Sequence, residues 1–248
     1  MEDMNRTEIV YKSENAIVVY KPPLVPSQQD KTGLADVLSI AEEQLRNMGE
    51  EDRLYPVNRL DAAVGGLLIA ARTGLAAASL SSIVADGRVR KEYFAVADGL
   101  LHDGHLVDYL SKDSRINKAI VHKSCQNGAK YAELYLKTLC SVDTSKGVKS
   151  LVRVELVTGR FHQIRAQLSS RGTPICGDKK YGSRDFGTRT PALFAAFISL
   201  DLEGEQIRAY KCPPTDTYPW NLFPAELYIL NDEGPRAGSP IITVNKTQ

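Results

Sequence analysis

Hydrophobic positions recur along the chain with two spacings, and each spacing predicts one kind of element. Residues 8–21 contain two short apolar runs separated by a Ser-Glu-Asn turn, which predicts two strands that end at Pro22. Residues 34–48 place apolar side chains three and four positions apart, as one face of a helix does. Thr73 precedes a second helical pattern that Gly87 ends.

Later segments alternate between apolar and polar residues, which is typical of half-buried strands. The alternation predicts a strand at 93–97, two long strands at 130–140 and 149–157, and a hairpin of residues 192–202 and 206–211. Residues 100–128 are interpreted as rich in loops. Thr158 and Gly159 end a strand, and a short helix is expected to follow and to end near Gly172.

Many short strands with three or four helices predict the α+β class. The chain contains no internal repeat, and no linker divides it, so residues 1–231 are expected to form one domain. From Asp232 onwards the composition changes to Gly, Pro, Ser, Thr and Asn, which predicts a flexible tail over residues 232–248.

The overall charge excludes a protein that binds nucleic acid through bulk basicity. The 248 residues include 31 Lys and Arg against 30 Asp and Glu, so the net charge is +1. Any contact with RNA or DNA must therefore come from a local patch. Residues 158–184 are the most unbalanced segment, with six basic residues against one acid, Asp178.

The cysteines and histidines argue against a metal centre. The four cysteines lie far apart without paired spacing, which favours neither a zinc site nor a disulfide framework and fits a reducing cytoplasm. The four histidines are scattered as well. The N-terminus is polar, and the longest apolar runs have half the length of roughly 20 residues that a bilayer requires. We expect a soluble cytoplasmic protein without a metal or a membrane segment.

The stretch around Asp61 is the strongest candidate for chemistry. Asn58, Arg59, Leu60 and Asp61 follow one short apolar segment, and Gly65 and Gly66 open a run that predicts a buried strand. A carboxylate between apolar segments is costly unless it has a charged partner or a task. Glycines let the backbone turn tightly or let another group approach closely. The residues alone leave open whether Asp61 belongs to a structural ion pair or reacts.

Two further side chains suit a site that acts on a nucleobase. Tyr93 lies on a predicted strand, where a tyrosine usually belongs to the core, but three basic residues just upstream weaken that interpretation. Arg165 lies on the predicted short helix, three positions from His162 and so on the same face. An arginine beside a carboxylate keeps it ionised, and an aromatic ring can stack on a base. The spacing does not show that Asp61, Tyr93 and Arg165 meet.

Five blocks of the chain resemble, in order, those of RluA-type pseudouridine synthases. One such block is weak evidence, whereas five ordered blocks over residues 9–224 are specific. They are Val19-Tyr-Lys21-Pro-Pro, Asn58-Arg-Leu-Asp61, Arg90-Lys-Glu-Tyr93-Phe-Ala, Thr158-Gly-Arg-Phe-His-Gln-Ile-Arg165 and Gly172-Thr-Pro-Ile-Cys-Gly-Asp178-Lys-Lys-Tyr181-Gly.

The resemblance implies an isomerase that converts uridine to pseudouridine in ribosomal or transfer RNA, without metal or cofactor. It implies an α+β fold with a mixed, mainly antiparallel sheet, flanking helices and a central active-site cleft. Asp61 would be the catalytic aspartate, Tyr93 would pack on the flipped base, and Arg165 would pair with Asp61. RNA would be the partner of a monomer. Six further residues are expected to bind the substrate: Asn58, Arg59, Lys91, Arg160, His162 and Gln163.

The chain departs from the family pattern at several positions. Asn58 replaces the usual histidine, Val64-Gly65-Gly66 replaces Thr-Ser-Gly, and Gln167 and Phe194 replace two further histidines. An alternative function is therefore an RNA-binding or ribosome-assembly factor that kept the scaffold and lost turnover. The first predicted strand begins near residue 8, so we expect the N-terminal RNA-binding module common in the family to be absent.

Overall fold

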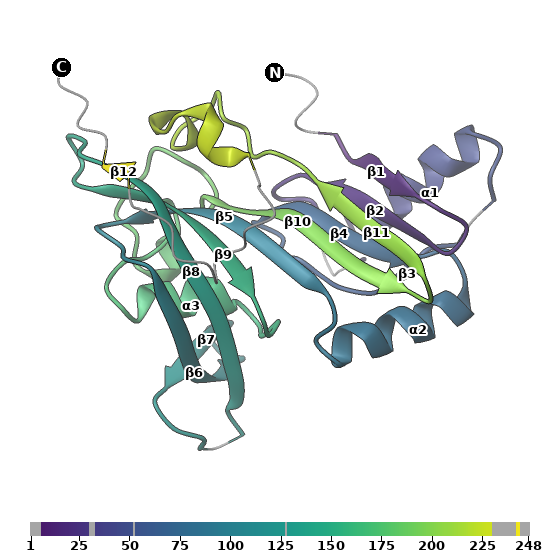
Figure 1. The fold of residues 1–248 in the computed structure, drawn as a ribbon, viewed down its shortest axis with the longest axis horizontal. Helices are drawn as coiled ribbons and strands as arrows, with labels where there is room; N and C mark the ends of the chain where they lie inside the picture. The colour runs from purple at the N-terminus through teal and green to yellow at the C-terminus, as the bar shows by residue number, and fades with distance from the viewer. Residues whose placement is uncertain (1–5, 30–32, 52, 127, 230–241, 244–248) are drawn as a thin grey trace. The chain divides into compact units, whose positions relative to one another are not determined.

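The computed structural model describes residues 6–29, 33–51, 53–126, 128–229 and 242–243 (Figure 1). The chain divides into two compact units. The first comprises residues 1–91 and 194–211, and the second comprises residues 92–193 and 212–248. Most of the predicted C-terminal tail, residues 232–241 and 244–248, lies outside the described residues.

The first unit is built on a mixed sheet that joins the start of the chain to a late hairpin. Its strand order is β1 (Glu8–Lys12), β2 (Ala16–Lys21), β4 (Gly65–Ala71), β10 (Leu193–Leu202) and β11 (Glu205–Tyr210). A short strand, β3 (Tyr55–Pro56), pairs with the end of β4. The pairs are antiparallel except β4 with β10, which run parallel. Both predicted hairpins are thereby confirmed.

Two capped helices belong to the first unit. Helix α1 (Val37–Asn47) begins at Asp36, whose carboxylate accepts the backbone N–H groups of Leu38 and Ser39. It packs against β2 and β4 through a core that includes Leu45 and Leu68. Helix α2 (Gly74–Ala85) is capped by Thr73 as predicted.

The predicted limits of α1 were too wide. The helix begins at residue 37 and not at 34, because the Asp36 cap fixes its first turn. Leu34 and Met48 lie outside it and are 58% and 64% exposed. Leu75, near the start of α2, is 81% exposed.

The second unit contains a five-stranded antiparallel order of β5 (Arg90–Asp98), β9 (Lys149–Leu156), β8 (Lys130–Val142), β6 (Gly104–Asp113) and β7 (Lys118–His122). Strand β12 (Ile242–Thr243) pairs parallel to β8. The prediction that residues 100–128 are mainly loop was wrong, because β6 and β7 form a hairpin there. Polar and apolar residues do not alternate cleanly there, since Val107 and Ile120 are exposed and Asp108 is buried, so the sequence lacks the usual pattern of a strand.

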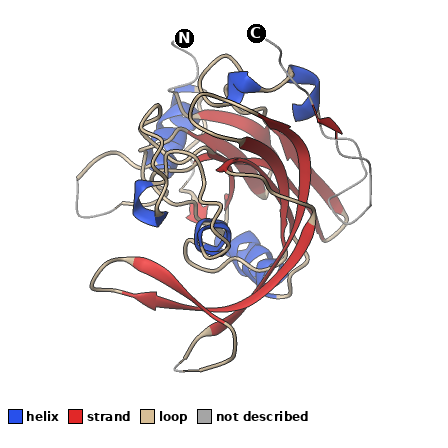
Figure 2. Ribbon diagram, turned by 90° about the vertical axis from the view of Figure 1, so that its left-hand side faces the viewer, coloured by secondary structure: helices blue, strands red, loops and turns tan. Residues whose placement is uncertain are grey.

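Helix α3 (Gln163–Ser169) packs on the β6–β8 face of this unit. Ala166 contributes to a cluster with Leu110, Ala119, Ala132 and Tyr181. Short 3-10 helices follow at η2 (Lys179–Tyr181), η3 (Trp220–Leu222) and η4 (Ala225–Tyr228). Strands outweigh the helices throughout the described chain (Figure 2), so the α+β prediction is confirmed. None of the described helices combines the length and apolarity needed to span a bilayer.

Candidate active site

Asp61 lies half-buried on a loop, residues 57–64, that leads into β4. The buried ammonium of Lys21 donates to three backbone carbonyls, those of Pro22 (2.9 Å), Val25 (2.8 Å) and Ala62 (3.0 Å). The carbonyl of Ala62, next to Asp61, also accepts the N–H of Leu24 at 2.7 Å. The block that contains Lys21 therefore holds the Asp61 loop in place.

Two more side chains tie down the same loop. The hydroxyl of Ser27 donates to the carbonyl of Leu60 at 2.8 Å and accepts its N–H at 3.1 Å. The amide oxygen of Asn58 accepts the N–H of Ile69 on β4 at 2.9 Å. Asn58, which we expected to contact the substrate, therefore has a structural contact, and its contact with RNA stays a prediction.

The glycines after Asp61 allow β4 and β10 to approach each other. A Cβ atom on Gly66 would lie 2.3–2.7 Å from backbone atoms of Ala195, and the φ of Gly66 is 128°. A Cβ atom on Gly65 would lie 3.1 Å from the ring of Pro23. Gly66, which keeps the glycine of the family's Thr-Ser-Gly, thus permits a close backbone approach that a side chain at this position would block.

Burial disfavours the charged form of Lys21. Burial lowers its pKa to about 7, and the charge of nearby Asp61 opposes that shift. An ammonium has three N–H donors and matches the three carbonyls, whereas the neutral amine has two. The protonation state of Lys21 is therefore coupled to the hydrogen bonding of the loop that carries Asp61.

In the second unit, Arg165 forms a buried ion pair with Asp178. Its Nε donates to Oδ2 at 2.6 Å and its Nη2 to Oδ1 at 2.9 Å, and the residues are 5% and 1% exposed. This two-bond geometry fixes the plane of the guanidinium. The sequence offered one signal for Asp178, since it is the single acid of the basic segment. The predicted pairing of Arg165 with Asp61 stays a prediction, because the two residues belong to different units.

His162 lies immediately before α3 and not within it. Its φ of 51° places it in the left-handed region at the N-cap, so the predicted helical face shared with Arg165 was wrong. Its ring stacks on Phe161 with centroids 3.8 Å apart, and its Nδ1 lies 2.9 Å from the hydroxyl of Tyr181. Burial, followed by the charges of Arg165 and Lys180, lowers the pKa of His162 to about 3, so the ring stays neutral.

Tyr181 contacts both His162 and Arg165, although it was not among the predicted site residues. Its hydroxyl accepts the N–H of Ala119 at 2.7 Å and also forms a hydrogen bond with Nδ1 of His162 at 2.9 Å. The guanidinium of Arg165 lies 5.0 Å from the centre of the Tyr181 ring.

Two other predicted binding residues, Gln163 and Arg160, already form hydrogen bonds within the protein. Gln163 is 3% exposed. Its Oε1 accepts the hydroxyl of Thr158 (2.8 Å) and the N–H of Arg160 (3.0 Å), and its Nε2 donates to the backbone carbonyl of Glu133. This side chain shapes the turn before α3. The exposed Arg160 side chain donates from Nε to the carbonyl of Tyr131 at 2.7 Å.

The remaining three predicted residues are Arg59, on the Asp61 loop, and Lys91 and Tyr93, on β5. Arg59 is exposed beside Asp61. Tyr93 lies on β5 and is 8% exposed, with both neighbours along the strand buried. Burial lowers the pKa of Lys91, which precedes it. Contact of these three side chains with RNA stays a prediction.

One group in the described chain has the spacing of metal ligands, namely Asp98, Cys176 and Asp185. The ammonium of Lys149 lies 2.5 Å from a carboxylate oxygen of Asp98 and 2.8 Å from one of Asp185. Burial raises the pKa of the Cys176 thiol to about 12. A thiol that stays protonated and an ammonium between the carboxylates do not suit a metal ion.

The mixed, mainly antiparallel sheet with its helices is an α+β fold, and solved pseudouridylate synthase domains share it. The chain belongs to the RNA pseudouridylate synthase family, whose model matches residues 15–170. The resemblance that the five motif blocks indicated is confirmed, and the relatives carry RluA-type names.

Three curated relatives illustrate the similarity. An uncharacterized RNA pseudouridine synthase of Bacillus subtilis, YjbO, is 28% identical over 84% of this chain and 73% of its own length. The ribosomal large subunit pseudouridine synthase C of Rickettsia conorii is 31% identical over 71% of this chain. RNA pseudouridine synthase 7 of Arabidopsis thaliana is 31% identical over 70% of this chain. The chain spans 57% of the Rickettsia protein and 44% of the Arabidopsis protein.

Two solved structures share the fold. Human RNA pseudouridylate synthase domain containing 1 has a TM-score of 0.70 at 23% identity and covers 86% of each chain. Human RNA pseudouridylate synthase domain containing 4 has a TM-score of 0.66 at 22% identity and covers 83% of this chain and 88% of its own.

Proposed function

We propose that this protein is an RNA pseudouridine synthase that isomerises specific uridines in ribosomal or transfer RNA. The observation that carries the proposal is the loop of Asp61, which Lys21, Ser27 and Asn58 hold at three separate points. A catalytic group must be held in one geometry, whereas a surface carboxylate needs no such bracing. The family match and the names of the relatives support the same activity.

In the proposed reaction the carboxylate of Asp61 acts at the flipped uridine. The bond between C1′ of the ribose and N1 of the base breaks, the base turns, and C5 bonds to C1′. The proton on C5 is then removed and N1 takes up a proton, with the oxygen of Tyr93 proposed to receive the C5 proton as its own proton passes on to solvent. Flipping costs a few kcal/mol, which stacking on Tyr93 and contacts with phosphates offset.

Arg165 is proposed to orient Asp61. Asp178 accepts from its Nε and Nη2 and so fixes the plane of the guanidinium. A fixed guanidinium keeps a neighbouring carboxylate ionised and aimed. We expect Arg59, Lys91 and Arg160 to contact the opened RNA, and the enzyme to act in the cytoplasm as a monomer that needs neither metal nor cofactor.

The proposal is tested by release of tritium from ribosomal and transfer RNA labelled at uridine C5. Asp61→Asn keeps the shape of the side chain and removes its charge, so the rate should fall on the order of 10³-fold or more. Asp86→Asn is the matched control, because Asp86 is an exposed residue at the end of α2 in the same unit. The control should retain the wild-type rate.

Two outcomes would contradict the proposal. If the wild-type protein releases no more tritium than Asp61→Asn from any of these RNAs, it is not the enzyme we propose. If, in addition, RNA binding and growth of the source cells are unchanged by Asp61→Asn, the protein is an RNA-binding or assembly factor on the same scaffold.

A further inference from the structure

Phe186 is the most exposed aromatic side chain in the described part of the chain, with 71% of its surface open to solvent. It lies on the loop of residues 182–190, which follows η2 in the second unit. A single exposed apolar side chain is ordinary on a protein surface, so exposure alone does not indicate a binding site. The rigid backbone around Phe186 and the lysine beside its ring distinguish it from such residues.

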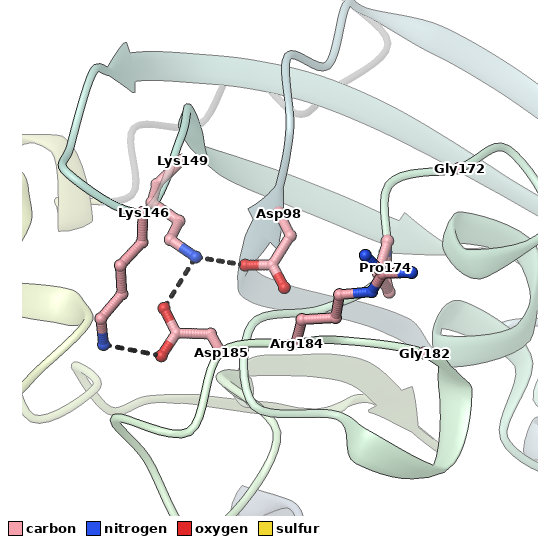
Figure 3. Close-up of a pocket in the computed structure, with 8 residues that line it drawn as sticks. All are labelled: Asp98, Lys146, Lys149, Gly172, Pro174, Gly182, Arg184 and Asp185. Carbon is pink, nitrogen blue, oxygen red and sulfur yellow. Dashed lines mark hydrogen bonds and ion pairs between the residues drawn. The ribbon is translucent and has the colours of Figure 1, made fainter.

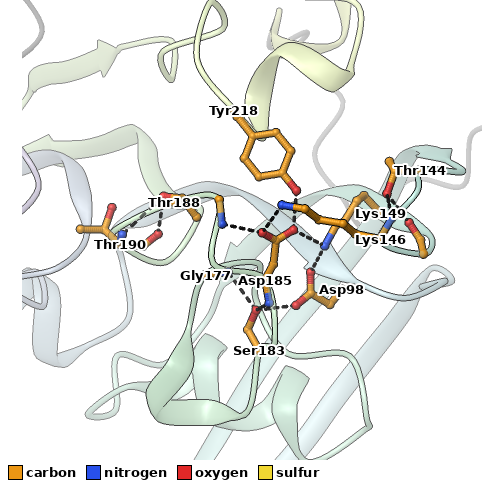
Figure 4. A network of polar contacts seen from close by, with 12 residues as sticks. Asp98, Thr144, Lys146, Lys149, Gly177, Ser183, Asp185, Thr188, Thr190 and Tyr218 are labelled. Atoms are coloured by element: carbon orange, nitrogen blue, oxygen red, sulfur yellow. Dashed lines mark hydrogen bonds and ion pairs between the residues drawn. The ribbon is translucent and has the colours of Figure 1, made fainter.

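The residue before this ring anchors the loop in the protein (Figure 4). The Oδ1 of Asp185 accepts Lys146 at 3.2 Å and the N–H of Gly187 at 2.8 Å, and its Oδ2 accepts Lys149 at 2.8 Å and the hydroxyl of Tyr218. Burial alone would raise the pKa of Asp185, but the hydrogen bonds from Lys149 and Tyr218 hold it well below its usual range. Asp185 is thus a fixed anion, and because Gly187 donates to it, the backbone is held on both sides of the ring.

Close packing fixes the same loop at two further points. A Cβ atom on Gly187 would lie 2.7 Å from the ring of Tyr218, and one on Gly177 would lie 2.3 Å from the side chain of Thr188. The backbone of the loop therefore lies directly against its neighbours. A side chain displayed on a fixed backbone loses less conformational entropy when a partner binds, which favours binding.

Residues 179–190 expose positive charges and bury their negative one. Asp185 is the single acid of this segment, and it is turned towards Lys146 and Lys149, which neutralise it (Figure 3). Figure 3 shows the side chain of Arg184 extending away from that carboxylate. The exposed cations of the segment are Lys179, Arg184 and Arg189. The outer surface of the segment is therefore basic and complements a polyanion.

Lys179 lies against the ring of Phe186, with its Nζ 5.0 Å from the ring centre. Among the described residues no carboxylate pairs with this ammonium. Lys179 directly follows Asp178, whose carboxylate binds Arg165. The exposed ring and its lysine thus adjoin, within the same unit, the ion pair of the candidate active site.

We propose that Phe186 and Lys179 form an RNA contact in which an unpaired base stacks on the open part of the ring and Lys179 contacts a neighbouring phosphate. Aromatic rings beside cations are the elements from which sites for single-stranded nucleic acid are built. The inference rests on the proposed function, which supplies RNA as the substrate. The base that stacks here is not the flipped uridine, which Tyr93 is proposed to receive.

Filter binding of bulk transfer RNA and of fragmented ribosomal RNA to the full chain tests the stacking. Phe186→Ala should weaken binding about fivefold or more, because the stacking of one base is lost. Phe186→Trp keeps an aromatic face and should bind as wild type does. Leu75→Ala is the matched control, because Leu75 is an exposed apolar residue of the first unit, and its affinity should be unchanged.

The salt dependence of binding separates the two side chains. Phe186→Ala removes no charge, so the slope of log affinity against log salt should stay the same. Lys179→Gln should reduce that slope by about 0.7–0.9, because one phosphate contact is lost, whereas Arg46→Gln removes an exposed cation of α1 and should leave it unchanged. Both side chains of the proposed contact are exposed, so their variants should melt at the wild-type temperature.

The outcomes separate this inference from the proposed function. Wild-type affinity in Phe186→Ala, or an equal loss in Phe186→Trp, overturns the stacking contact, and an unchanged salt slope in Lys179→Gln overturns the phosphate contact. If sedimentation shows a dimer that Phe186→Ala dissociates while RNA affinity is unchanged, the ring belongs to a contact between copies of the chain, and the RNA contact is overturned. Binding needs no turnover, so these results do not depend on that of Asp61→Asn.

Discussion

Lys21 is the residue whose surroundings most constrain the Asp61 loop. Its side chain is fully buried. Its ammonium donates to the carbonyl of Ala62 in the Asp61 loop and to the carbonyls of Pro22 and Val25 in the turn after β2. A buried unpaired carbonyl costs about 1–3 kcal/mol, so the lysine cannot be removed without loosening the loop. The cost of keeping it is the burial of its charge, which the lowered pKa reflects.

The pKa of Lys21 predicts a pH dependence of stability. Its pKa is about 7 in the folded protein and 10.5 when exposed, so between these values the unfolded state retains the proton and the folded state loses it. The free energy of unfolding of wild type should therefore rise with pH in this window, by up to about 1.4 kcal/mol per pH unit, relative to Lys21→Met.

Urea unfolding of both proteins at pH 6.5 and pH 9.5 measures this difference. Because all other titrating groups are shared, the comparison isolates Lys21. A difference in stability between the two proteins that is the same at both pH values would contradict the assigned pKa.

At the scale of elements, the parallel contact between β4 and β10 depends on a glycine. A methyl group on Gly66 would collide with the backbone of Ala195, which cannot move without disturbing both strands. Gly66→Ala should therefore lower the free energy of unfolding by about 3 kcal/mol or more.

Gly74→Ala is the matched control for this substitution. Gly74 is the first residue of α2, and a Cβ atom there meets nothing within 4 Å. This variant should be unchanged or slightly more stable, by about 0.4–1 kcal/mol. Equal denaturation midpoints for the two variants would show that the strands do not need the glycine.

The hairpin β6–β7 shows why one element escaped prediction. Its exposed positions include the apolar residues Val107 and Ile120, whereas Leu110 and Ala119 are buried in a cluster with Ala166 of α3. A strand that exposes apolar residues and buries a polar one lacks the alternation by which a strand is recognised in sequence. The longer strands β8 and β9 were predicted correctly because their apolar residues recur without interruption.

At the scale of the whole molecule, a net charge of +1 means that RNA must be held by a local group of cations. Lys112 lies over the ring of Phe161 with its Nζ 4.4 Å from the centroid, and Lys118 lies 5.6 Å from that of Tyr181. These two rings flank His162. The two lysines are thus positive charges placed around a neutral imidazole.

The combined substitution Lys112→Gln and Lys118→Gln should weaken binding of bulk transfer RNA about tenfold at low salt, because two phosphate contacts are lost. The control removes two exposed charges from the first unit, as Arg46→Gln with Arg53→Gln. Filter binding over a range of salt concentrations measures both. An equal loss in the control would show that net charge, and not the position of the lysines, governs the affinity.

The sequence by itself determined the class of fold and the family, because both depend on local periodicity and on motifs read in order along the chain. It also identified Asp61, Tyr93 and Arg165 as candidates, since their blocks are contiguous. The tertiary structure decided which groups touch. Lys21 holds the carbonyl of Ala62, 41 positions away, and Lys149 binds Asp98, 51 positions away. Such contacts arise when packed strands bring distant segments together, and no spacing within one segment encodes them.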